Sequence, residues 1–455
     1  MRSLLTTALE FVAPVIEHRL FNAVQIRDPE LEPYSAPNGF PFLVRFTDSV
    51  PELIEPVARF LGFWFARVTR EPARRPGELL RKNSASAIAA DLKDWWEYLS
   101  FKGLNWDRAE QTDVEEYRNS MLIAISPHTH RPFRRQTIRR RLSTLIKFYA
   151  WAKHNKLCNL AITDDDEGVA SAAPGRPRYL AGLYPRGWKR DEIMPRRDTT
   201  SWSEVRCFSP KEYRKVADGL GPKLTDKKSI HGATPFRLVC DLMVTTGIRI
   251  SEALSLTIAH VDALDDIASS KNGVAYLRLT ATKGNKPRSV PVPTFVIHQL
   301  KQYLERHRPV VAKASETSRS APLFLNGRDA TRTQGRPLKP AFFRDRFNRA
   351  VKKARLIRPR LNYDLQTGHP TELTTHTFTP HCLRHTFAIW RYYAERSLGN
   401  PEPWKIIQAI LGHAHLTTTL NIYLKATAEY ELSVSNKYAV DYLHQIIADP
   451  GEGPV

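Results

Sequence analysis

Cysteine is scarce in this chain, and its spacing excludes two kinds of protein. The four cysteines, Cys158, Cys207, Cys240 and Cys382, lie far apart, and none belongs to a C-x-x-C pair. This spacing argues against a zinc site and against a disulfide framework, and it fits a reducing cytoplasm. We therefore expect a cytoplasmic protein without a structural metal.

Long apolar runs are also missing. Glu10 and Glu17 interrupt the short apolar opening, and no later run is long enough for a signal core or a membrane span. The sequence has no G-x-x-x-x-G-K-[ST] loop and no plausible metal cluster. We therefore expect no membrane attachment, no metal and no cofactor such as ATP.

Acidic residues are too few to balance the basic ones. The 455 residues include 68 Lys plus Arg against 47 Asp plus Glu, which gives a formal net charge of +21. A chain this basic usually meets a polyanion, and nucleic acid is the commonest one. An anionic membrane is the weaker alternative, because the basic residues are spread over mixed segments and do not line one amphipathic helix.

The pattern of apolar residues predicts a mainly α protein with a small antiparallel β-sheet in its second domain. Hydrophobic residues make up 42% of the chain, enough for two or three domains with buried cores. We expect a helical domain over 46–160 and a second domain over 206–447, with strand character between Ala275 and Val292. The remaining segments are an arm of unknown role (1–45), a linker rich in Pro, Gly and Arg (161–205) and a flexible tail (448–455).

The helical domain contains a strongly basic helix. Ile138, Leu142, Leu145, Ile146 and Tyr149 recur at helical spacing and predict one apolar face. Basic residues precede this helix and occupy its other faces, and six of them are expected to bind DNA: Arg134, Arg135, Arg139, Arg140, Arg141 and Lys147. Such contacts mostly neutralise phosphates and fix the register of a protein on a duplex.

Arg249 is predicted to lie on a tight turn between two helices. The residues before Gly247 are apolar at helical spacing, and glycine is well suited to end a helix. Ser251 is expected to cap the next helix, with Glu252 in its first turn. A guanidinium held on such a turn can clamp a phosphate, although a surface arginine paired with Glu252 is the simpler reading of Arg249 alone.

A helix start is predicted at Thr379, with Thr379 as its cap and Pro380 at the first helical position. His381, Arg384 and His385 then lie near one face of its first turns, where free N–H groups favour an anion. Arg384 is the natural second phosphate clamp and His381 a proton-transfer group. We interpret His385 as a buried structural residue beside the site.

Lys283 precedes Gly284 and Asn285, which suit a hairpin turn between the expected strands. A lysine at the tip of a mobile hairpin could protonate a leaving oxygen, with Lys286 and Arg288 as phosphate contacts. By itself the segment is read more readily as a solvated basic turn. Tyr423 follows a Leu-Gly-His sequence that ends at His413, and its phenol could form a covalent link to a phosphodiester.

In this order the motifs resemble the catalytic domain of the tyrosine recombinases, also called the phage integrase family. The resemblance is close over about 206–445, and more loosely the helical domain looks like the SAM-like core-binding domain that completes their two-domain DNA clamp. Glu252 matches an acidic residue that supports the first arginine. Carried over by motif, the resemblance implies this catalytic set: Arg249, Lys283, His381, Arg384, His413 and the nucleophile Tyr423.

Two positions depart from the family pattern. Cys382 stands where members often have Asp, and His413 and Tyr423 are ten residues apart, one more than in many members. One extra residue on a helix rotates a side chain by ~100°. We expect the loop after His413 to absorb the extra residue; otherwise His415 would replace His413, or the tyrosine would be displaced.

The resemblance implies a site-specific recombinase or integrase that cleaves and rejoins DNA through a 3′-phosphotyrosine intermediate and serves a mobile element in the nucleoid. It further implies duplex DNA with inverted core sites, a homotetramer on that DNA and possible accessory recombination proteins. Two alternatives remain open. A type IB topoisomerase has the same residues, and a non-catalytic DNA-binding subunit could have kept the fold alone.

Overall fold

The computed structural model divides into two compact units, whose boundary lies inside the expected linker. The N-terminal unit comprises Met1–Thr200 and Arg360–Leu373, and the C-terminal unit comprises Ser201–Pro359 and Thr374–Val455. The structure describes residues 21–25, 41–46, 51–69, 78–158, 193–196, 205–224, 235–265, 274–280, 287–312, 317–328, 330, 332–413, 415–417, 419–420, 422–423 and 427. Lys283, Lys286, the start of the arm, most of the linker and the tail therefore lie outside the described residues.

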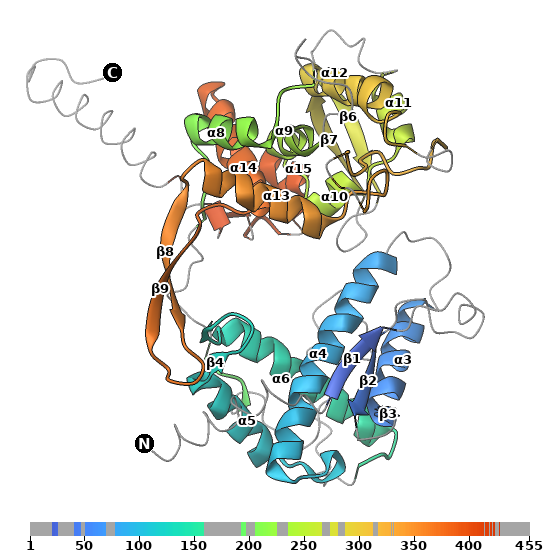
Figure 1. The fold of residues 1–455 in the computed structure, drawn as a ribbon, viewed down its shortest axis with the longest axis vertical. Helices are drawn as coiled ribbons and strands as arrows, with labels where there is room; N and C mark the ends of the chain where they lie inside the picture. Colours follow the sequence, from blue (N-terminus) through green and yellow to red (C-terminus); the bar gives the residue numbers. More distant parts are fainter. Residues whose placement is uncertain are drawn as a thin grey trace, which may run out of the picture. The chain divides into compact units, whose positions relative to one another are not determined.

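The N-terminal unit combines a small sheet with a set of helices (Figure 1). Its elements are β1 (Phe21–Gln25), β2 (Pro41–Phe46), β3 (Pro51–Leu53), α3 (Glu55–Thr69), α4 (Glu78–Lys102), η2 (Trp106–Arg108), α5 (Gln111–Ile123), β4 (Ile125–Ser126), β5 (Arg131–Pro132) and α6 (Arg135–His154). The antiparallel order β1-β2-β3 pairs Ala23 with Leu43 and Val44 with Leu53. Part of the segment expected to be an irregular arm is thus a sheet, formed by long-range pairing that local propensity does not reveal.

The core of the N-terminal unit follows the predicted helical periodicity. Leu92, Trp95 and Leu99 of α4 are buried, as are the five predicted apolar positions of α6. Two large aromatic residues keep their polar atoms satisfied in this core, because Trp95 Nε1 donates to the Tyr149 hydroxyl at 2.9 Å, which donates to the Trp106 carbonyl at 2.8 Å. The helical periodicity therefore identified the packing face correctly.

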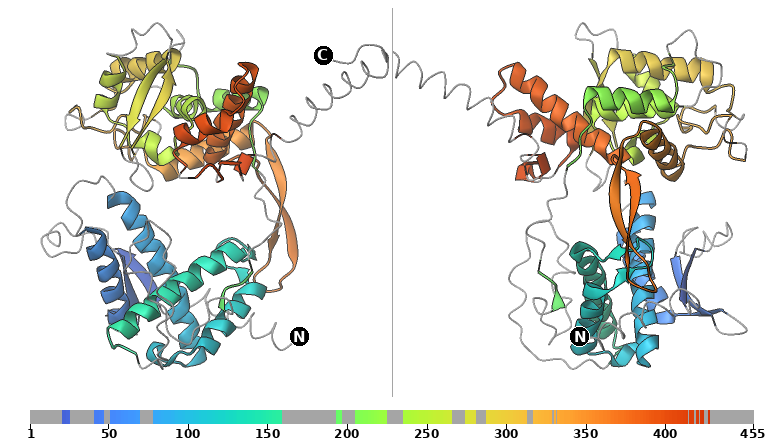
Figure 2. Two further views of the ribbon diagram at one scale, coloured as in Figure 1. Left: turned by 180° about the vertical axis from the view of Figure 1, so that it is seen from behind. Right: turned by 60° about the vertical axis from the view of Figure 1, so that its left-hand side comes forward.

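The C-terminal unit is a helical bundle with one β-hairpin beside it (Figures 1 and 2). Its elements are α8 (Pro210–Leu220), α9 (Phe236–Thr246), α10 (Ile250–Leu254), α11 (Ile258–Asp265), β6 (Val274–Leu279), β7 (Arg288–Pro293), α12 (Thr294–Gln302), the π-helix η5 (Tyr303–His307), α13 (Pro340–Lys353), α14 (Pro380–Ser397) and α15 (Pro403–Leu411). Strands β8 (Ile357–Tyr363) and β9 (Pro370–His376) are divided between the two units, because Arg360–Leu373 belongs to the N-terminal unit. Strands β6 and β7 pair antiparallel, with Ala275 opposite Val292, which confirms the expected strands. Helix α9 is buried along nearly its whole length and packs against α14 and β7.

A long two-stranded ribbon, β8–β9, was not predicted from the sequence (Figure 2). The Asp364 carboxylate shapes its turn by accepting from the backbone N–H groups of Gln366 at 2.9 Å and Thr367 at 2.7 Å. The ribbon tip belongs to the N-terminal unit, where Tyr363 N–H donates to the His130 carbonyl at 2.8 Å. Among the described residues, no helix is both long and apolar enough to cross a membrane.

Candidate active site

Arg249 lies in the turn between the end of α9 and the start of α10. Helix α9 ends at Thr246, and Gly247 adopts the left-handed conformation at φ 67°. A Cβ at Gly247 would lie 2.4 Å from a ring atom of Phe387, so packing as well as backbone geometry requires glycine here. Arg249 is itself the N-cap of α10, which corrects the expected cap at Ser251.

Glu252 organises two arginines beneath this turn. Its buried carboxylate accepts from the Arg249 backbone N–H at 2.8 Å and from the Arg249 guanidinium at 3.0 Å. Arg288 binds the same carboxylate with two parallel hydrogen bonds of 3.0 and 2.7 Å. Burial raises the pKa of Glu252, but Arg288 and Arg249 together outweigh burial, so the net pKa is lowered and the group stays ionised.

Arg288 therefore departs from the role expected for it. Its Nε donates to the Ile410 carbonyl at 2.8 Å while its two terminal nitrogens hold Glu252. The guanidinium is almost fully buried in this arrangement. Arg288 acts here as an internal tie between β7, α10 and α15, and direct phosphate contact by Arg288 remains an untested prediction.

Helix α14 begins as predicted, with Thr379 as its N-cap and Pro380 at the first helical position. The Cys382 thiol lies 3.3 Å from the Thr379 backbone N–H, the position that an acidic side chain fills in a capping box. Cysteine can thus replace aspartate at this position and still contact the helix start. His381 reaches the surface at one edge, and partial burial, then the charges of Arg384 and Arg249, lowers its pKa.

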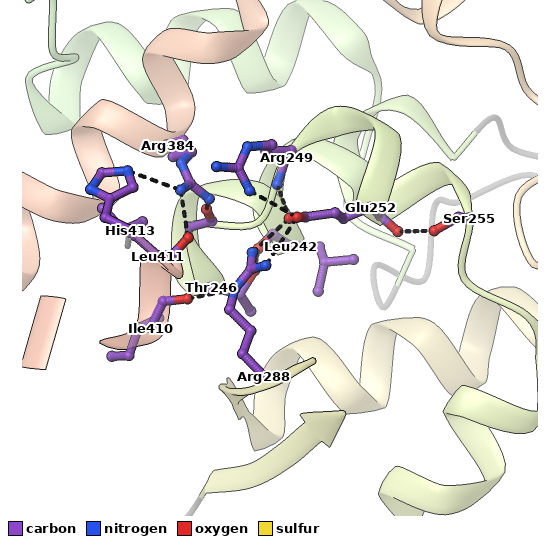
Figure 3. A network of polar contacts seen from close by, with 11 residues as sticks. Leu242, Thr246, Arg249, Glu252, Ser255, Arg288, Arg384, Ile410, Leu411 and His413 are labelled. Carbon is purple, nitrogen blue, oxygen red and sulfur yellow. Dashed lines mark hydrogen bonds and ion pairs between the residues drawn. The ribbon is translucent and has the colours of Figure 1, made fainter. Parts of the chain in front are cut away.

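Arg384 is the central cation of the site, and only 2% of it is exposed. Its guanidinium donates to the carbonyls of Gly247 and Leu411, both at 2.7 Å, and contacts His413 Nε2 at 3.3 Å (Figure 3). Burial first and Arg249 second lower the pKa of Arg384 to about 9, so it remains a cation at neutral pH. Arg384 thereby connects the C-terminal ends of α9 and α15. Its remaining N–H groups can donate to a ligand.

His413 follows Gly412, which ends α15 in the left-handed conformation at φ 69°. Because arginine can only donate, His413 Nε2 is the acceptor from Arg384, and its Nδ1 then carries the proton toward Thr419 Oγ1 at 2.8 Å. Burial, together with the charges of Arg384 and Arg249, lowers the pKa of His413 to about 4. His413 is therefore a neutral imidazole near pH 7.

Tyr423 lies in the interior of the same unit, with 1% of its surface exposed. Its ring stacks on Trp404 with centroids 5.8 Å apart and ring planes 7° apart, and its hydroxyl lies 3.0 Å from His385 Nδ1. Burial raises the pKa of Tyr423 above its ordinary value, although Arg384 and Arg249 lower it in part. Burial and three neighbouring cationic or imidazole groups lower the pKa of His385 to about 3.

Five of the six expected catalytic residues gather in the C-terminal unit. Arg249, His381, Arg384, His413 and Tyr423 perturb one another's protonation or share hydrogen bonds, whereas Lys283 lies outside the described residues. His413 lies after the end of α15 and outside that helix, so the spacing to Tyr423 is not that of one continuous helix. His415 is exposed, while His413 contacts Arg384, so the geometry favours His413 over His415.

Sequence reasoning missed three contacts of this site: Arg288 with Glu252, Trp404 with Tyr423, and His385 with Tyr423. For the last pair, the adjacency of His385 to Arg384 in the H-x-x-R-H string was the available signal. Among the described residues, no group of three His, Cys, Asp or Glu side chains is arranged to hold a metal ion.

The expected DNA-binding arginines of α6 differ in their surroundings. Arg134, Arg135, Arg140 and Lys147 are exposed, and Arg140 also pairs with buried Asp91. Arg139 donates to the Pro195 carbonyl. The mostly buried guanidinium of Arg141 pairs with Asp94 and lies over the Phe133 ring, 4.7 Å from its centroid, and a DNA contact by Arg141 stays a prediction.

Comparison with known proteins follows the same division of the chain. Residues 224–429 match the phage integrase family, and residues 78–156 match the phage integrase N-terminal SAM-like domain. Tyrosine recombinase XerC of Anoxybacillus flavithermus is 24% identical over 352 residues, which is 77% of this chain and 91% of that protein. Tyrosine recombinase XerD of Mycobacterium tuberculosis is 32% identical over 191 residues, 42% of this chain and 48% of that protein.

A solved structure has a similar fold. It is the XerH site-specific recombinase bound to a palindromic difH substrate in a post-cleavage complex, with a TM-score of 0.50 and 17% identity. The match covers 95% of each chain. At this identity the likeness concerns the mainly helical fold.

Proposed function

Because the chain belongs to the phage integrase family, whose members are tyrosine recombinases that cleave and rejoin DNA strands, we propose that Tyr423 is its nucleophile. The observation that carries this proposal is the convergence of Arg249, Arg384, His413 and Tyr423 from separate segments of the C-terminal unit. Two arginines beside a phenol suit the transfer of a phosphoryl group to that phenol.

In the cleavage step, Tyr423 Oη bonds to the phosphorus of one DNA strand while the bond from phosphorus to the 5′ oxygen breaks. The products are a 3′-phosphotyrosine and a free 5′-hydroxyl, so the energy of the phosphodiester is stored in the covalent link. Rejoining reverses the step, with a 5′-hydroxyl of the same strand or of another strand as the attacking group. The chain itself supplies every group that this chemistry uses.

Arg249 and Arg384 would bind the two non-bridging oxygens of the scissile phosphate. Both are held in place before DNA arrives, Arg249 by Glu252 and Arg384 by two backbone carbonyls. Donors fixed in this way need little reorganisation as charge develops in the transition state. A bound phosphate would also favour protonation of His413, which could then donate to an oxygen.

Lys283 is proposed as the acid that protonates the leaving 5′ oxygen, with His381 as a second proton-transfer group. Lys286 is proposed as a phosphate contact. The exposed residues Arg134, Arg135, Arg140 and Lys147 of the N-terminal unit would bind the duplex backbone. We propose inverted core sites as the target, with a homotetramer on DNA, in a nucleoid-associated enzyme of a mobile element.

The test uses duplexes tiled across the DNA that flanks the encoding gene. Each duplex is incubated with the wild-type chain or with Tyr423→Phe, without metal or ATP, then quenched in detergent and resolved on a denaturing gel. A retarded protein–DNA adduct is expected with the wild type alone, because Tyr423→Phe removes only the phenolic oxygen. An adduct formed by Tyr423→Phe would refute Tyr423 as the nucleophile.

The same duplexes, together with a supercoiled plasmid and paired duplexes that carry the identified site, address the two alternatives. Specific binding by the wild type without any adduct at any duplex, even with paired sites on one DNA, would favour a DNA-binding subunit. Supercoil relaxation without joining of two separate duplexes would favour a topoisomerase. Joined strands from two duplexes are expected.

A further inference from the structure

His385 makes a contact that the proposed chemistry has not yet used. Its Nδ1 lies 3.0 Å from Tyr423 Oη, and the two rings meet at 67° with centroids 5.5 Å apart. His385 is the residue directly after Arg384 on α14, so the backbone that holds the phosphate clamp also holds this imidazole. The contact involves the oxygen atom that is proposed to attack DNA.

The direction of this hydrogen bond follows from burial. The Tyr423 hydroxyl is a donor in a site where only 1% of the residue is exposed, and an unpaired buried donor is costly. His385 Nδ1 is the acceptor that the described residues offer to it. The phenol therefore donates to Nδ1, and the imidazole carries its own proton on Nε2.

The groups around His385 keep its Nδ1 able to accept a hydrogen bond. The His381 ring packs edge-on against the His385 ring, with ring centroids 4.6 Å apart. Arg384 lies on the same helix and His413 follows the end of α15, and both act electrostatically on His385. Together with burial they lower the pKa of His385 to about 3, so the ring is neutral near pH 7. A neutral acceptor can hold the phenolic hydrogen, whereas an imidazolium could not.

Two contacts then fix the nucleophile. Trp404 lies parallel to the Tyr423 ring and sets its plane, and His385 sets the direction of the O–H bond. With its hydrogen directed at Nδ1, the lone pairs of Oη point away from His385. Resting on the proposed function, we propose that His385 orients the Tyr423 phenol and accepts its proton as Oη bonds to phosphorus.

The step balances in protons and bonds. The Oη–P bond forms as the O–H bond passes its hydrogen to Nδ1, while the 5′ oxygen leaves with a proton from the leaving-group acid. In rejoining, the imidazolium returns its proton to Tyr423 as the Oη–P bond breaks. The free protein resists this transfer, because the phenol holds its proton tightly, and a bound phosphate anion would make the imidazolium more stable.

The test compares His385→Phe with His385→Asn on two substrates. His385→Phe keeps an aromatic ring of similar size but has no acceptor, and His385→Asn can present Oδ1 near the Nδ1 position without a basic atom. One duplex carries the normal 5′ oxygen at the cleavage site, and the other carries sulfur there, which leaves without protonation. A defect of the nucleophile persists on sulfur, whereas a defect in protonating the leaving group is rescued.

We expect His385→Phe to slow adduct formation by ~100-fold or more on both duplexes, as loss of a proton acceptor does, with unchanged DNA affinity. His385→Asn should fall between His385→Phe and the wild type. Cleavage by His385→Phe at the wild-type rate, or its full recovery on the sulfur duplex, would overturn the proposal. If instead Tyr423→Phe still forms adducts, the proposed function itself fails, so the two failures are distinct.

A second measurement reads the tautomer in the wild-type chain and uses variants only to assign and perturb its signal. Histidine labelled with ¹⁵N in the wild-type chain reports its tautomer, and the His385 signal is identified by its loss in His385→Asn or in His385→Gln. We expect a proton on Nε2, with an Nδ1 shift that changes in Tyr423→Phe. A proton on Nδ1 would contradict the direction of the hydrogen bond and with it the proposal.

Discussion

The two sides of the candidate active site are built from opposite chemistry. On the phosphate side, Arg249, Arg288 and Arg384 are fixed by the Glu252 carboxylate and by backbone carbonyls. On the nucleophile side, Tyr423 is buried between Trp404 and a neutral His385. One side is a network of permanent charges, and the other contains no charge near neutral pH.

This difference fits the chemistry that we propose for each side. A phosphate carries its charge before and after reaction, so preorganised cations bind it without reorganisation. A phenol must remain protonated until it attacks, because a free phenolate beside two arginines would bind them in place of the phosphate. Stability and rate should therefore respond differently to changes on the two sides.

The largest expected effect on the phosphate side comes from its arginines. Arg249→Ala and Arg384→Ala should each slow adduct formation by at least ~100-fold, as the loss of one transition-state donor does. Only Arg384→Ala should also lower the melting temperature, because it leaves the buried carbonyls of Gly247 and Leu411 without donors. Near-normal rates of adduct formation in both variants would refute the proposal that these arginines bind the scissile phosphate.

Glu252 tests whether the charged network is needed for folding or for rate. Glu252→Ala leaves the buried Arg288 guanidinium unpaired and should lower the free energy of unfolding by about 3 kcal/mol. The double variant Glu252→Leu with Arg288→Met should recover most of that stability, because both charges are gone. Its cleavage should stay slow, since Arg249 loses its support; normal cleavage would show that Glu252 serves stability alone.

Acid should weaken the nucleophile side first. The pKa values of His385 and His413 are lowered to about 3 and about 4, so below pH 6.5 the unfolded chain binds more protons than the folded one. Between pH 6.5 and 5 we expect a loss of about 1 kcal/mol for each histidine, after allowance for partial exposure. Melting temperatures across this range measure the loss, and His385→Asn should show a flatter profile.

The smallest expected effect concerns the arginines of the N-terminal unit. Arg134→Ala should weaken DNA binding slightly and reduce the slope of log affinity against log salt by about 0.9, as the loss of one phosphate contact does. Arg141→Met should leave that slope unchanged and instead lower stability, because Arg141 pairs with Asp94. Equal slopes for both variants would contradict this distinction between exposed and internal arginines.

The parts of the site that were predictable are local in sequence. Gly247 ends α9, and Thr379 with Pro380 begins α14, because helix ends depend on residues within a turn of the end. The clustering of His381 and Arg384 follows from helical periodicity alone. The cap at Ser251 was wrong by two positions, since the Glu252 side chain reached back to Arg249.

Other features depended on pairing between distant segments. The β1–β2 pairing and the tie from Arg288 to Glu252 involve partners that no local pattern specifies. The ion pairs of Arg141 with Asp94 and of Arg288 with Glu252 were likewise not predictable, because the sequence shows the charge of a basic side chain but not its neighbours in the fold.

The sequence by itself determined the mainly α fold, the helix ends around the site and the identity of its chemical groups. Only the tertiary structure decided that Arg288 closes an internal ion pair with Glu252 and that Tyr423 meets His385. The physical reason is that helix signals act over a few residues, whereas protonation and hydrogen bonding depend on burial and on every charge nearby. Those neighbours come together only when α9, α10, α14 and α15 pack.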